Sequence, residues 1–433
     1  VVALDATTGC LRWSMQADGP VRTAPVLDDN GRLYIGDLLG QLYALEGSTG
    51  RVLWKSKLDA HPHARITAAP AFHEGRLYVA VASQEEGMAS DPLYPCCTFR
   101  GSVAAVEAAS GKILWKTYMV PDPPKLVGKN AAGAQSFANS GIGVRVTPTL
   151  DPSRRALYVT TGENYSPPAT ALVNAFVALS MDTGEVQWAR QITPGDVWNV
   201  ACISPDRTNC PFEPGPDANF GMAPMLIDAG PGQRLLIAGQ KSGVVTAIDP
   251  DRQGEVVWQT RIGKGGLLGG IQWGGATDGR RVYMPLSDYG LTVVGRRQYG
   301  NPDPKEGGGL FALDAASGRV VWQAPPAACP AERVPCSPAQ SAAATLIPGV
   351  VLSGAMDGVL RAYDAETGEV IWSFDTARVF ETVNNVAARG GSMDGAGPVA
   401  AGGMVYVTSG YSIFGGMPGN VLLAFKPREA KSN

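Results

Sequence analysis

Seven segments of this chain repeat one pattern, and that repeat constrains the fold more than any other feature of the sequence. Each copy opens with an apolar run, reaches an acidic or polar residue and a glycine-containing turn, and closes with a second apolar run that ends in tryptophan. An eighth copy near Phe425 stops before its tryptophan. Self-similarity of this kind is the signature of a repeat architecture. The seven closing tryptophans are Trp13, Trp54, Trp115, Trp188, Trp258, Trp322 and Trp372.

Each copy has the pattern of a β-hairpin within a larger sheet. Two short apolar runs joined by a glycine-containing turn predict two antiparallel strands. Upstream of most copies lies a strand-like run with a tyrosine, as at residues 32–36, 76–80 and 156–160, and an apolar segment with proline precedes it. Groups of four such strands recur about every 40 to 70 residues, which is the spacing of the blades of a β-propeller. The repeats predict an all-β fold, an eight-bladed β-propeller that occupies residues 1–433 as a single domain.

The recurring residues have structural explanations. An Asp or Glu at the end of a strand accepts backbone N–H groups of the turn, and the glycine adopts a positive φ angle there. We expect each repeat tryptophan to pack between neighbouring blades and to donate its indole N–H to a backbone carbonyl. None of the seven is therefore a candidate for chemistry.

Composition excludes several classes of function. The net charge is −3 and no basic run occurs, so nothing indicates nucleic-acid binding. No apolar stretch approaches the length of a membrane span, and no signal peptide is present. The chain starts inside what should be the third strand of a blade. We therefore expect strands and a secretion signal upstream of Val1, because a ring left open would expose strand edges.

The seven cysteines indicate an oxidising compartment. Cys202 and Cys210 bracket a short loop, as do Cys329 and Cys336, and close pairs of this kind suit disulfides. Metal binding is the weaker alternative, because the chain has only three histidines and none is near these cysteines in the sequence. Cys10 is left over, and we expect it to be reduced and packed.

Long inserted loops carry the functional signal. The segments at residues 116–147 and 160–174 are too long for hairpin turns and lack periodicity. Loops of this length within a compact domain are often functional, and propellers bind ligands where loops of several blades converge. We expect the loops to meet over the central channel.

These loops carry a family resemblance that extends through essentially the whole chain. The repeat resembles that of the quinoprotein dehydrogenases, which use pyrroloquinoline quinone (PQQ), and the inserted loops are most similar to the polyvinyl alcohol dehydrogenase group. The resemblance implies a periplasmic, PQQ- and Ca²⁺-dependent enzyme that oxidises secondary alcohols such as polyvinyl alcohol and passes electrons to cytochrome c. No Cys-x-x-Cys-His haem motif occurs in this chain. The phrases that carry the resemblance are DPLYPCCTFRG, ALYVTTGENYSPPAT, GDVWNVAC, LIAGQKSGVV, LGGIQWG and SPAQSAA.

The resemblance also implies roles for single residues. Glu86, or its neighbour Glu85, matches one ligand of the Ca²⁺ ion, and Asn164 matches a second, with Glu163 adjacent to it. Such hard oxygen ligands suit Ca²⁺. The remaining matches concern the quinone. Lys241 matches the residue that contacts the quinone oxygens and takes part in catalysis, and Gln272 and Trp273 match a pair that lies beside the quinone. Cys96 and Cys97 match a vicinal disulfide that lies against the face of the quinone.

Two positions depart from the methanol dehydrogenase pattern. Arg145 stands where a tryptophan stacks on the quinone there, and a guanidinium plane can also stack on a ring. Asn199 stands where the catalytic aspartate is expected, and an amide does not act as a base. Asp196, three residues earlier, is the nearest carboxylate, so Asp196 or a metal-bound glutamate is the predicted base.

Other interpretations remain open. Lys241 alone would be a solvated turn residue, Asp196 a cap of its loop, and Trp273 a core residue. The repeat is also shared with non-catalytic scaffold propellers of the outer-membrane assembly-factor type, which is the competing function. A sugar-binding or sugar-oxidising propeller is a third, weaker hypothesis.

Overall fold

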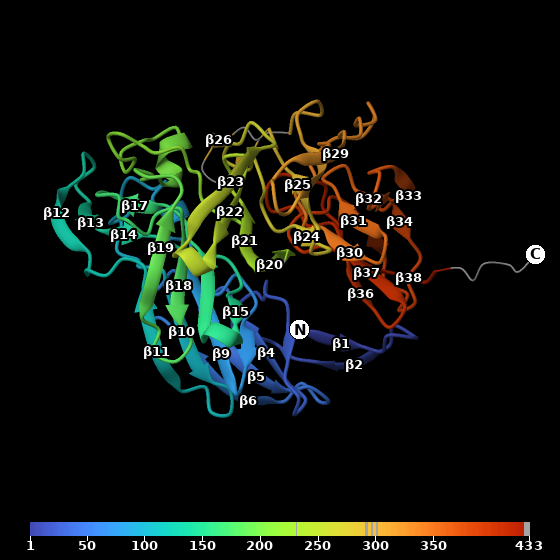
Figure 1. Cartoon of the computed structure of the whole chain (residues 1–433), viewed down its shortest axis with the longest axis horizontal. Helices are drawn as coiled ribbons and strands as arrows, with labels where there is room; N and C mark the ends of the chain where they lie inside the picture. Colours follow the sequence, from blue (N-terminus) through green and yellow to red (C-terminus); the bar gives the residue numbers. More distant parts are fainter. Residues whose placement is uncertain (231, 291–292, 296–297, 300–301, 428–433) are drawn as a thin grey trace, which may run out of the picture. The chain divides into compact units, whose positions relative to one another are not determined.

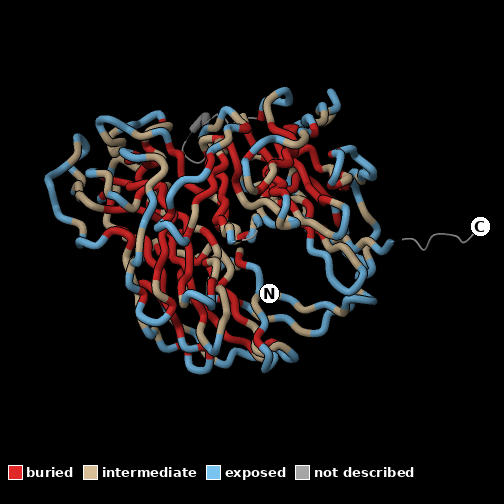
Figure 2. The backbone as a smooth tube through the Cα atoms, viewed as in Figure 1, coloured by how far each residue is buried: buried red, intermediate tan, exposed pale blue. Residues whose placement is uncertain are grey.

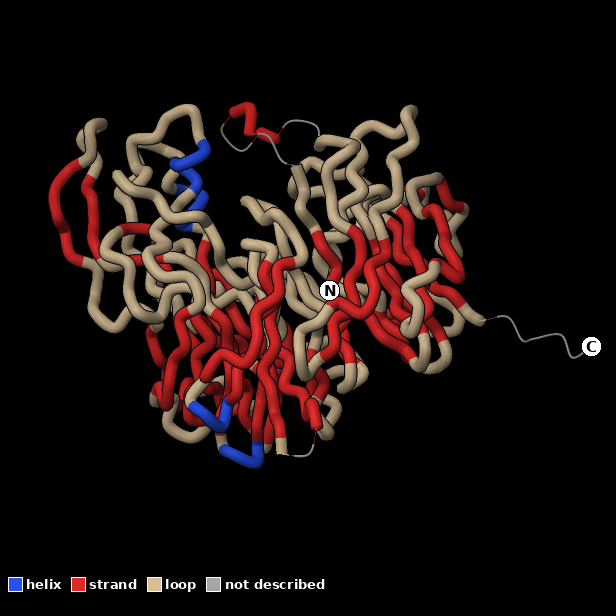
Figure 3. The backbone as a smooth tube through the Cα atoms, turned by 45° about the horizontal axis from the view of Figure 1, so that its top comes forward, coloured by secondary structure: helices blue, strands red, loops and turns tan. Residues whose placement is uncertain are grey.

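The computed structural model describes residues 1–230, 232–290, 293–295, 298–299 and 302–427. The chain divides into two compact units. The first comprises Val1–Leu226 and Asp249–Glu255, and the second comprises Ile227–Ile248 and Val256–Asn433. Strands account for nearly all regular structure (Figure 3), which confirms the predicted all-β class. Within the part of the chain that is described, no helix has both the length and the apolar character needed to cross a bilayer.

The first unit contains three blades, each an antiparallel sheet (Figure 1). Short two-stranded ribbons, one α-helical turn and three 3₁₀ turns, η1 (Pro152–Arg154), η2 (Val200–Ile203) and η3 (Pro250–Arg252), accompany them. The blades consist of β3 (Val26–Leu27), β4 (Arg32–Gly36), β5 (Gln41–Glu46) and β6 (Val52–Lys57); of β7 (Ala64–Arg65), β8 (Ala71–His73), β9 (Arg76–Ser83), β10 (Ser102–Glu107) and β11 (Ile113–Tyr118); and of β15 (Thr149–Asp151), β16 (Ala156–Thr160), β18 (Ala175–Ser180) and β19 (Val186–Gln191). The ribbons are β1 (Val2–Leu4) with β2 (Leu11–Ser14), β12 (Lys125–Lys129) with β13 (Gln135–Ala138), and β14 (Ser140–Gly141) with β17 (Asn164–Ser166), and the helical turn is α1 (Glu85–Met88).

The second unit continues the same architecture. Its last blade has three strands rather than four. The sheets are β20 (Met225–Gly230), β21 (Gln233–Gly239), β22 (Val244–Asp249) and β23 (Glu255–Arg261); β24 (Ala276–Thr277), β25 (Arg281–Leu286), β28 (Gly309–Asp314) and β29 (Val320–Ala324); β30 (Thr345–Ile347), β31 (Val350–Gly354), β32 (Val359–Asp364) and β33 (Val370–Asp375); and β36 (Val399–Ala401), β37 (Met404–Ser409) and β38 (Val421–Phe425). Two short ribbons accompany them, β26 (Val293–Gly295) with β27 (Gln298–Tyr299) and β34 (Val379–Phe380) with β35 (Ala388–Arg389).

The prediction of eight blades was wrong, because the described residues form seven. The repeat that ends at Trp13 folds as the two-stranded ribbon β1–β2, to which no further described strand is added. Counting hairpin repeats therefore counted this ribbon as a blade. Cys10 lies on the same ribbon and is free but exposed. The expectation that Cys10 would be packed was also wrong, since Cys10 lies in the exposed turn that joins β1 and β2.

Burial follows the position of a strand within its blade (Figure 2). In the blade β3–β6 the residues Leu42–Leu45 of the third strand are buried, whereas the tryptophan-bearing β6 is largely exposed or intermediate. A strand that is covered on both faces is apolar along its whole length rather than at alternate positions. This explains the continuous apolar runs with which the repeats open.

Within the described residues, five of the seven repeat tryptophans donate the indole N–H to a backbone carbonyl of the following blade, as predicted; they are Trp13, Trp54, Trp115, Trp258 and Trp322. Trp54 donates its indole N–H to the carbonyl of Ala108 at 3.0 Å, and Trp115 donates to the carbonyl of Met181 at 3.2 Å. The turn glycine forms the other half of this contact. Gly111 has a φ of +77°, and a β-carbon there would lie 2.6 Å from the Trp54 ring. Glycine is thus required both for the turn and for the close approach of the indole.

Candidate functional site

The helical turn α1 separates two adjacent glutamates that the sequence left as alternatives. Glu85 has no exposed surface and accepts hydrogen bonds from the backbone N–H groups of Thr98 at 2.8 Å and Phe99 at 2.7 Å, and from the Tyr94 hydroxyl at 3.0 Å. Burial alone would raise the pKa of Glu85, but the hydrogen bonds from His61 and from these N–H groups outweigh burial and lower it. Glu85 is therefore an ionised anchor for the segment that follows the adjacent cysteines.

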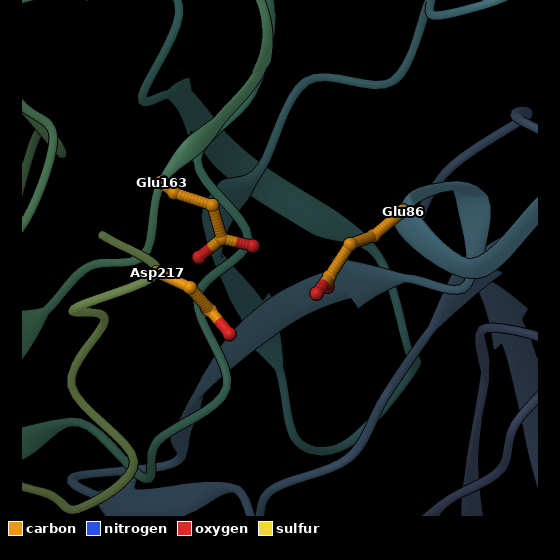
Figure 4. Close-up of side chains that lie close together, drawn as sticks. All are labelled: Glu86, Glu163 and Asp217. Carbon is orange, nitrogen blue, oxygen red and sulfur yellow. The ribbon is translucent and has the colours of Figure 1, made fainter. Parts of the chain in front are cut away.

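Glu86 points to a different group of side chains. Its carboxylate lies with those of Glu163 and Asp217, and one oxygen of each lies within 4.8 Å of the other two (Figure 4). Glu163 stands immediately before β17, and Asp217 lies in the loop that leads to β20. Glu163 and Asp217 are buried, while Glu86 is intermediate. Three convergent carboxylates offer hard oxygen donors, which fit a cation such as Ca²⁺.

Arg145 lies against this carboxylate cluster of Glu86, Glu163 and Asp217. Its guanidinium forms an ion pair with Glu86, lies 3.6 Å from an oxygen of Glu163, and donates to the Tyr165 hydroxyl at 3.4 Å. Burial opposes the charged form of Arg145, but the neighbouring carboxylates outweigh burial and raise its pKa. Arg145 therefore contributes a fixed positive charge that offsets part of the charge of the carboxylates.

Asn164, the second predicted metal ligand, has a fully buried side chain that bonds to backbone. Its amide nitrogen donates to the carbonyl of Ser140 at 2.7 Å, and its amide oxygen accepts from the N–H of Thr170 at 2.9 Å. These bonds fix the loop that presents Glu163. The role of Asn164 as a ligand stays a prediction.

Asp196 and Asn199 both support the loop between β19 and β20. Asp196 has no exposed surface, and burial and the charge of Glu163 raise its pKa against the effect of its hydrogen bonds. Asn199 accepts from the N–H of Ala201 at 3.0 Å and donates to the carbonyl of Tyr165 at 3.0 Å. The Asn199 amide thus joins backbone segments on both sides of this loop.

Three disulfides are present, as predicted. They join Cys96 to Cys97, Cys202 to Cys210, and Cys329 to Cys336. The vicinal pair is held from two sides. On one side, Glu85 accepts hydrogen bonds from Thr98 and Phe99, which follow the disulfide. On the other side, the N–H of Cys96 donates to the carbonyl of Gln135 in β13 at 3.1 Å.

The remaining predicted residues belong to the second unit. Lys241 is buried in the turn between β21 and β22, and the carbonyl of Gln240 beside it accepts from the N–H of Ile271 at 3.2 Å. This bond brings the turn of Lys241 next to the segment that carries Gln272 and Trp273. The Trp273 indole donates to Asp394 at 2.5 Å, and Ser341 donates to the same carboxylate oxygen at 2.7 Å. The indole N–H of Trp273 is thus satisfied by the buried Asp394 side chain, as expected for a partly buried indole.

Asp217 was missed in the sequence, and Glu163 was noted only as a neighbour of Asn164. Asp217 lies in the segment PGPDANFG, where the only sequence signal is a carboxylate in a Gly- and Pro-rich loop just after a cysteine pair. Such loops have no periodicity from which the direction of a side chain follows. Asn219 of the same segment donates to Glu163 at 2.5 Å and was missed for the same reason.

Comparison with known proteins places these features in context. The sequence profile of the family described as outer membrane protein assembly factor BamB matches residues 1–194, 241–329 and 306–431. The chain is 38% identical over 446 residues to a polyvinylalcohol dehydrogenase of Pseudomonas sp., covering 98% of this chain and 67% of that protein. It is 37% identical over 447 residues to a polyvinylalcohol dehydrogenase of Sphingopyxis sp. (strain 113P3), with the same two shares covered.

Solved structures show the same fold at lower identity. Quinohemoprotein alcohol dehydrogenase ADHIIG of Pseudomonas putida HK5 superposes with a TM-score of 0.68 at 19% identity, covering 100% of this chain and 73% of that chain. BamB of Moraxella catarrhalis superposes with a TM-score of 0.56 at 14% identity, covering 98% of this chain and 88% of that chain. The fold is thus common to both kinds of protein, and the sequence similarity extends over nearly the whole chain.

Proposed function

Because this chain belongs to the quinoprotein alcohol dehydrogenase family, we propose that it oxidises secondary alcohols such as polyvinyl alcohol to ketones, with PQQ and Ca²⁺ as cofactors. The family membership confirms the resemblance carried by the inserted loops. The proposal includes a periplasmic location and cytochrome c as electron acceptor. The observation that carries it is the carboxylate cluster of Glu86, Glu163 and Asp217.

The donor set of the cluster fits a hard metal ion. We propose that Glu86, Glu163 and Asp217 hold Ca²⁺, because carboxylate oxygens are its preferred ligands. Asn164 stays a proposed ligand, and its amide oxygen would have to exchange the N–H of Thr170 for the ion. A cation at this place would also offset the repulsion between three carboxylates that are largely removed from water.

We propose that several residues named by the family resemblance contact the quinone. A bound quinone would supply the two-electron acceptor for the alcohol, and a metal ion held by Glu86, Glu163 and Asp217 would supply Lewis acidity. Arg145 and Lys241 each supply positive charge, which stabilises negative charge that develops on oxygen. The residues that the resemblance proposes for this role are Cys96, Cys97, Arg145, Lys241, Gln272 and Trp273.

The hydroxyl proton of the alcohol must pass to a carboxylate. The sequence left Asp196 and a metal-binding glutamate as candidates. Within the cluster, the Glu86 side chain is 15% exposed whereas that of Glu163 is not exposed at all. We propose that Glu86 accepts the proton, because a base must be reached by the substrate. Asp196, which is fully buried, stays the alternative.

Reconstitution tests the proposal. The purified full chain is mixed with PQQ and Ca²⁺, and quinone absorbance and alcohol-dependent reduction of a dye are measured. We expect both for the natural protein, loss of dye reduction for Glu86→Gln, and both signals for the control Glu107→Gln, which alters an exposed residue at the end of β10. A panel of secondary alcohols and sugars then defines the substrate.

The competing function is a scaffold propeller without cofactor. The match to the profile described as outer membrane protein assembly factor BamB supports it, since the repeat itself is common to both. A scaffold has no need of the vicinal disulfide or of the carboxylate cluster. Failure of the natural protein to bind PQQ at micromolar concentration would favour the scaffold and refute the enzymatic proposal.

A further inference from the structure

Asp196 is surrounded by N–H donors. Its oxygen Oδ2 accepts from the amide of Asn174 at 2.7 Å and from the backbone N–H of Ala218 at 2.8 Å, and Oδ1 accepts from the N–H of Asp217 at 3.1 Å. All three donors are nitrogens, which is the environment of an ionised carboxylate used as an acceptor. The side chain has no exposed surface from which a substrate would approach it.

The segment that contains Asp217 is wrapped around this carboxylate. The N–H of Gly215 donates to the carbonyl of Val197 at 2.9 Å, and a β-carbon at Gly215 would lie 2.2 Å from Oδ1 of Asp196. Asp217 then adopts a left-handed backbone conformation with a φ of +54°, which is uncommon for residues other than glycine. The hydrogen bond from its own N–H to Asp196 supports this conformation.

The same short segment delivers two side chains to the carboxylate cluster. Asp217 contributes one of its three carboxylates, and Asn219 donates to Glu163 at 2.5 Å. Ala218 lies between these two residues, and its backbone N–H donates to the Asp196 carboxylate. The position of two members of the site thus depends on one buried acceptor outside it.

We infer that Asp196 is a positioning residue, which fixes Asp217 and Asn219 at the metal site and does not itself accept the proton of the alcohol. The inference rests on the proposed function, because it assigns Asp196 a role at the metal site proposed there. Asp196→Asn replaces one accepting oxygen by an NH₂ group, which faces N–H donors and repels the segment. The metal affinity falls as a result, while the groups that reach the substrate are retained.

The experiment measures terbium luminescence of the full chain after removal of bound metal, with calcium as competitor. We expect Asp196→Asn to weaken terbium and calcium binding by about tenfold or more, the range found when partners of metal ligands are removed. Asp37→Asn is the matched control. Asp37 is also fully buried and accepts from the N–H groups of Leu39 and Gln41, both at 2.9 Å, in a turn of another blade. It is expected to lose stability but not metal affinity.

Turnover distinguishes positioning from proton transfer. At saturating calcium, a positioning role predicts that Asp196→Asn recovers kcat to within about tenfold of the natural enzyme, whereas a base role predicts that kcat stays abolished. Gly215→Ala displaces the segment without altering the carboxylate, and is expected to weaken metal binding even if Asp196→Asn does not fold.

Natural-like terbium affinity in both Asp196→Asn and Gly215→Ala would overturn the inference, as would a kcat that saturating calcium does not restore. If the natural protein itself binds no terbium or calcium, the proposed metal site fails and the inference fails with it. These outcomes are distinguishable, because only the last one concerns the unaltered chain.

Discussion

Gly111→Ala tests whether the contact between tryptophan and turn glycine holds neighbouring blades together. Gly111 has a φ of +77°, so alanine there is strained by about 1–2 kcal/mol. Its β-carbon would also lie 2.6 Å from the ring of Trp54, and overpacking a filled contact costs about 1–3 kcal/mol more. The expected loss in the free energy of unfolding is therefore about 2–5 kcal/mol.

Gly75→Ala is the matched control for this prediction. Gly75 has a φ of +72°, but a β-carbon there would meet nothing within 4 Å. The control therefore carries the backbone strain alone, about 1–2 kcal/mol. The difference between the two variants, about 1–3 kcal/mol, isolates the packing of the indole against the turn.

Urea denaturation followed by tryptophan fluorescence measures both variants. Melting temperature is a less sensitive measure, because for a chain of 433 residues a loss of 1 kcal/mol lowers it by only about 1 °C if the chain unfolds as one unit. Equal destabilisation by the two substitutions would refute the reasoning. It would mean that the glycine is needed only for the turn and that the indole contact contributes nothing measurable.

Three further predictions concern the site and its framework. Glu163→Gln should weaken terbium binding by about tenfold or more in a luminescence titration, because it removes a buried carboxylate from the cluster. The pKa of Glu85 is lowered from its usual 4.5, so its ionised form stabilises the fold above pH 4.5 and that contribution is lost as the pH falls below it. The difference in urea midpoint between Glu85→Gln and the natural protein should accordingly shrink as the pH is lowered. A difference that stays constant with pH would contradict this. Joint replacement of Cys202 and Cys210 by serine should cost about 2–3 kcal/mol, because the disulfide closes a short loop, and an unchanged urea midpoint would contradict the estimate.

The candidate site was predictable only where a motif named its residues. Glu85 and Glu86 are adjacent, and the sequence left them as alternatives. The structure separates them, because successive side chains on the helical turn α1 point about 100° apart. One faces the backbone around the vicinal disulfide and the other faces Glu163. Asp217 could not be anticipated, since it lies in an irregular loop whose direction is set by hydrogen bonds to Asp196.

The sequence by itself determined everything that depends on near neighbours. The alternating runs and turns specified the strands, the recurring Trp and Gly specified the docking contact, and the close cysteine pairs specified three disulfides. These features follow from backbone hydrogen bonds and sterics within a few dozen residues, so they repeat wherever the pattern repeats. Tertiary structure alone decided that seven blades form, that Cys10 is exposed, and that Glu86, Glu163 and Asp217 meet. Contacts between loops far apart in the chain depend on how complete blades pack, and no local pattern carries that information.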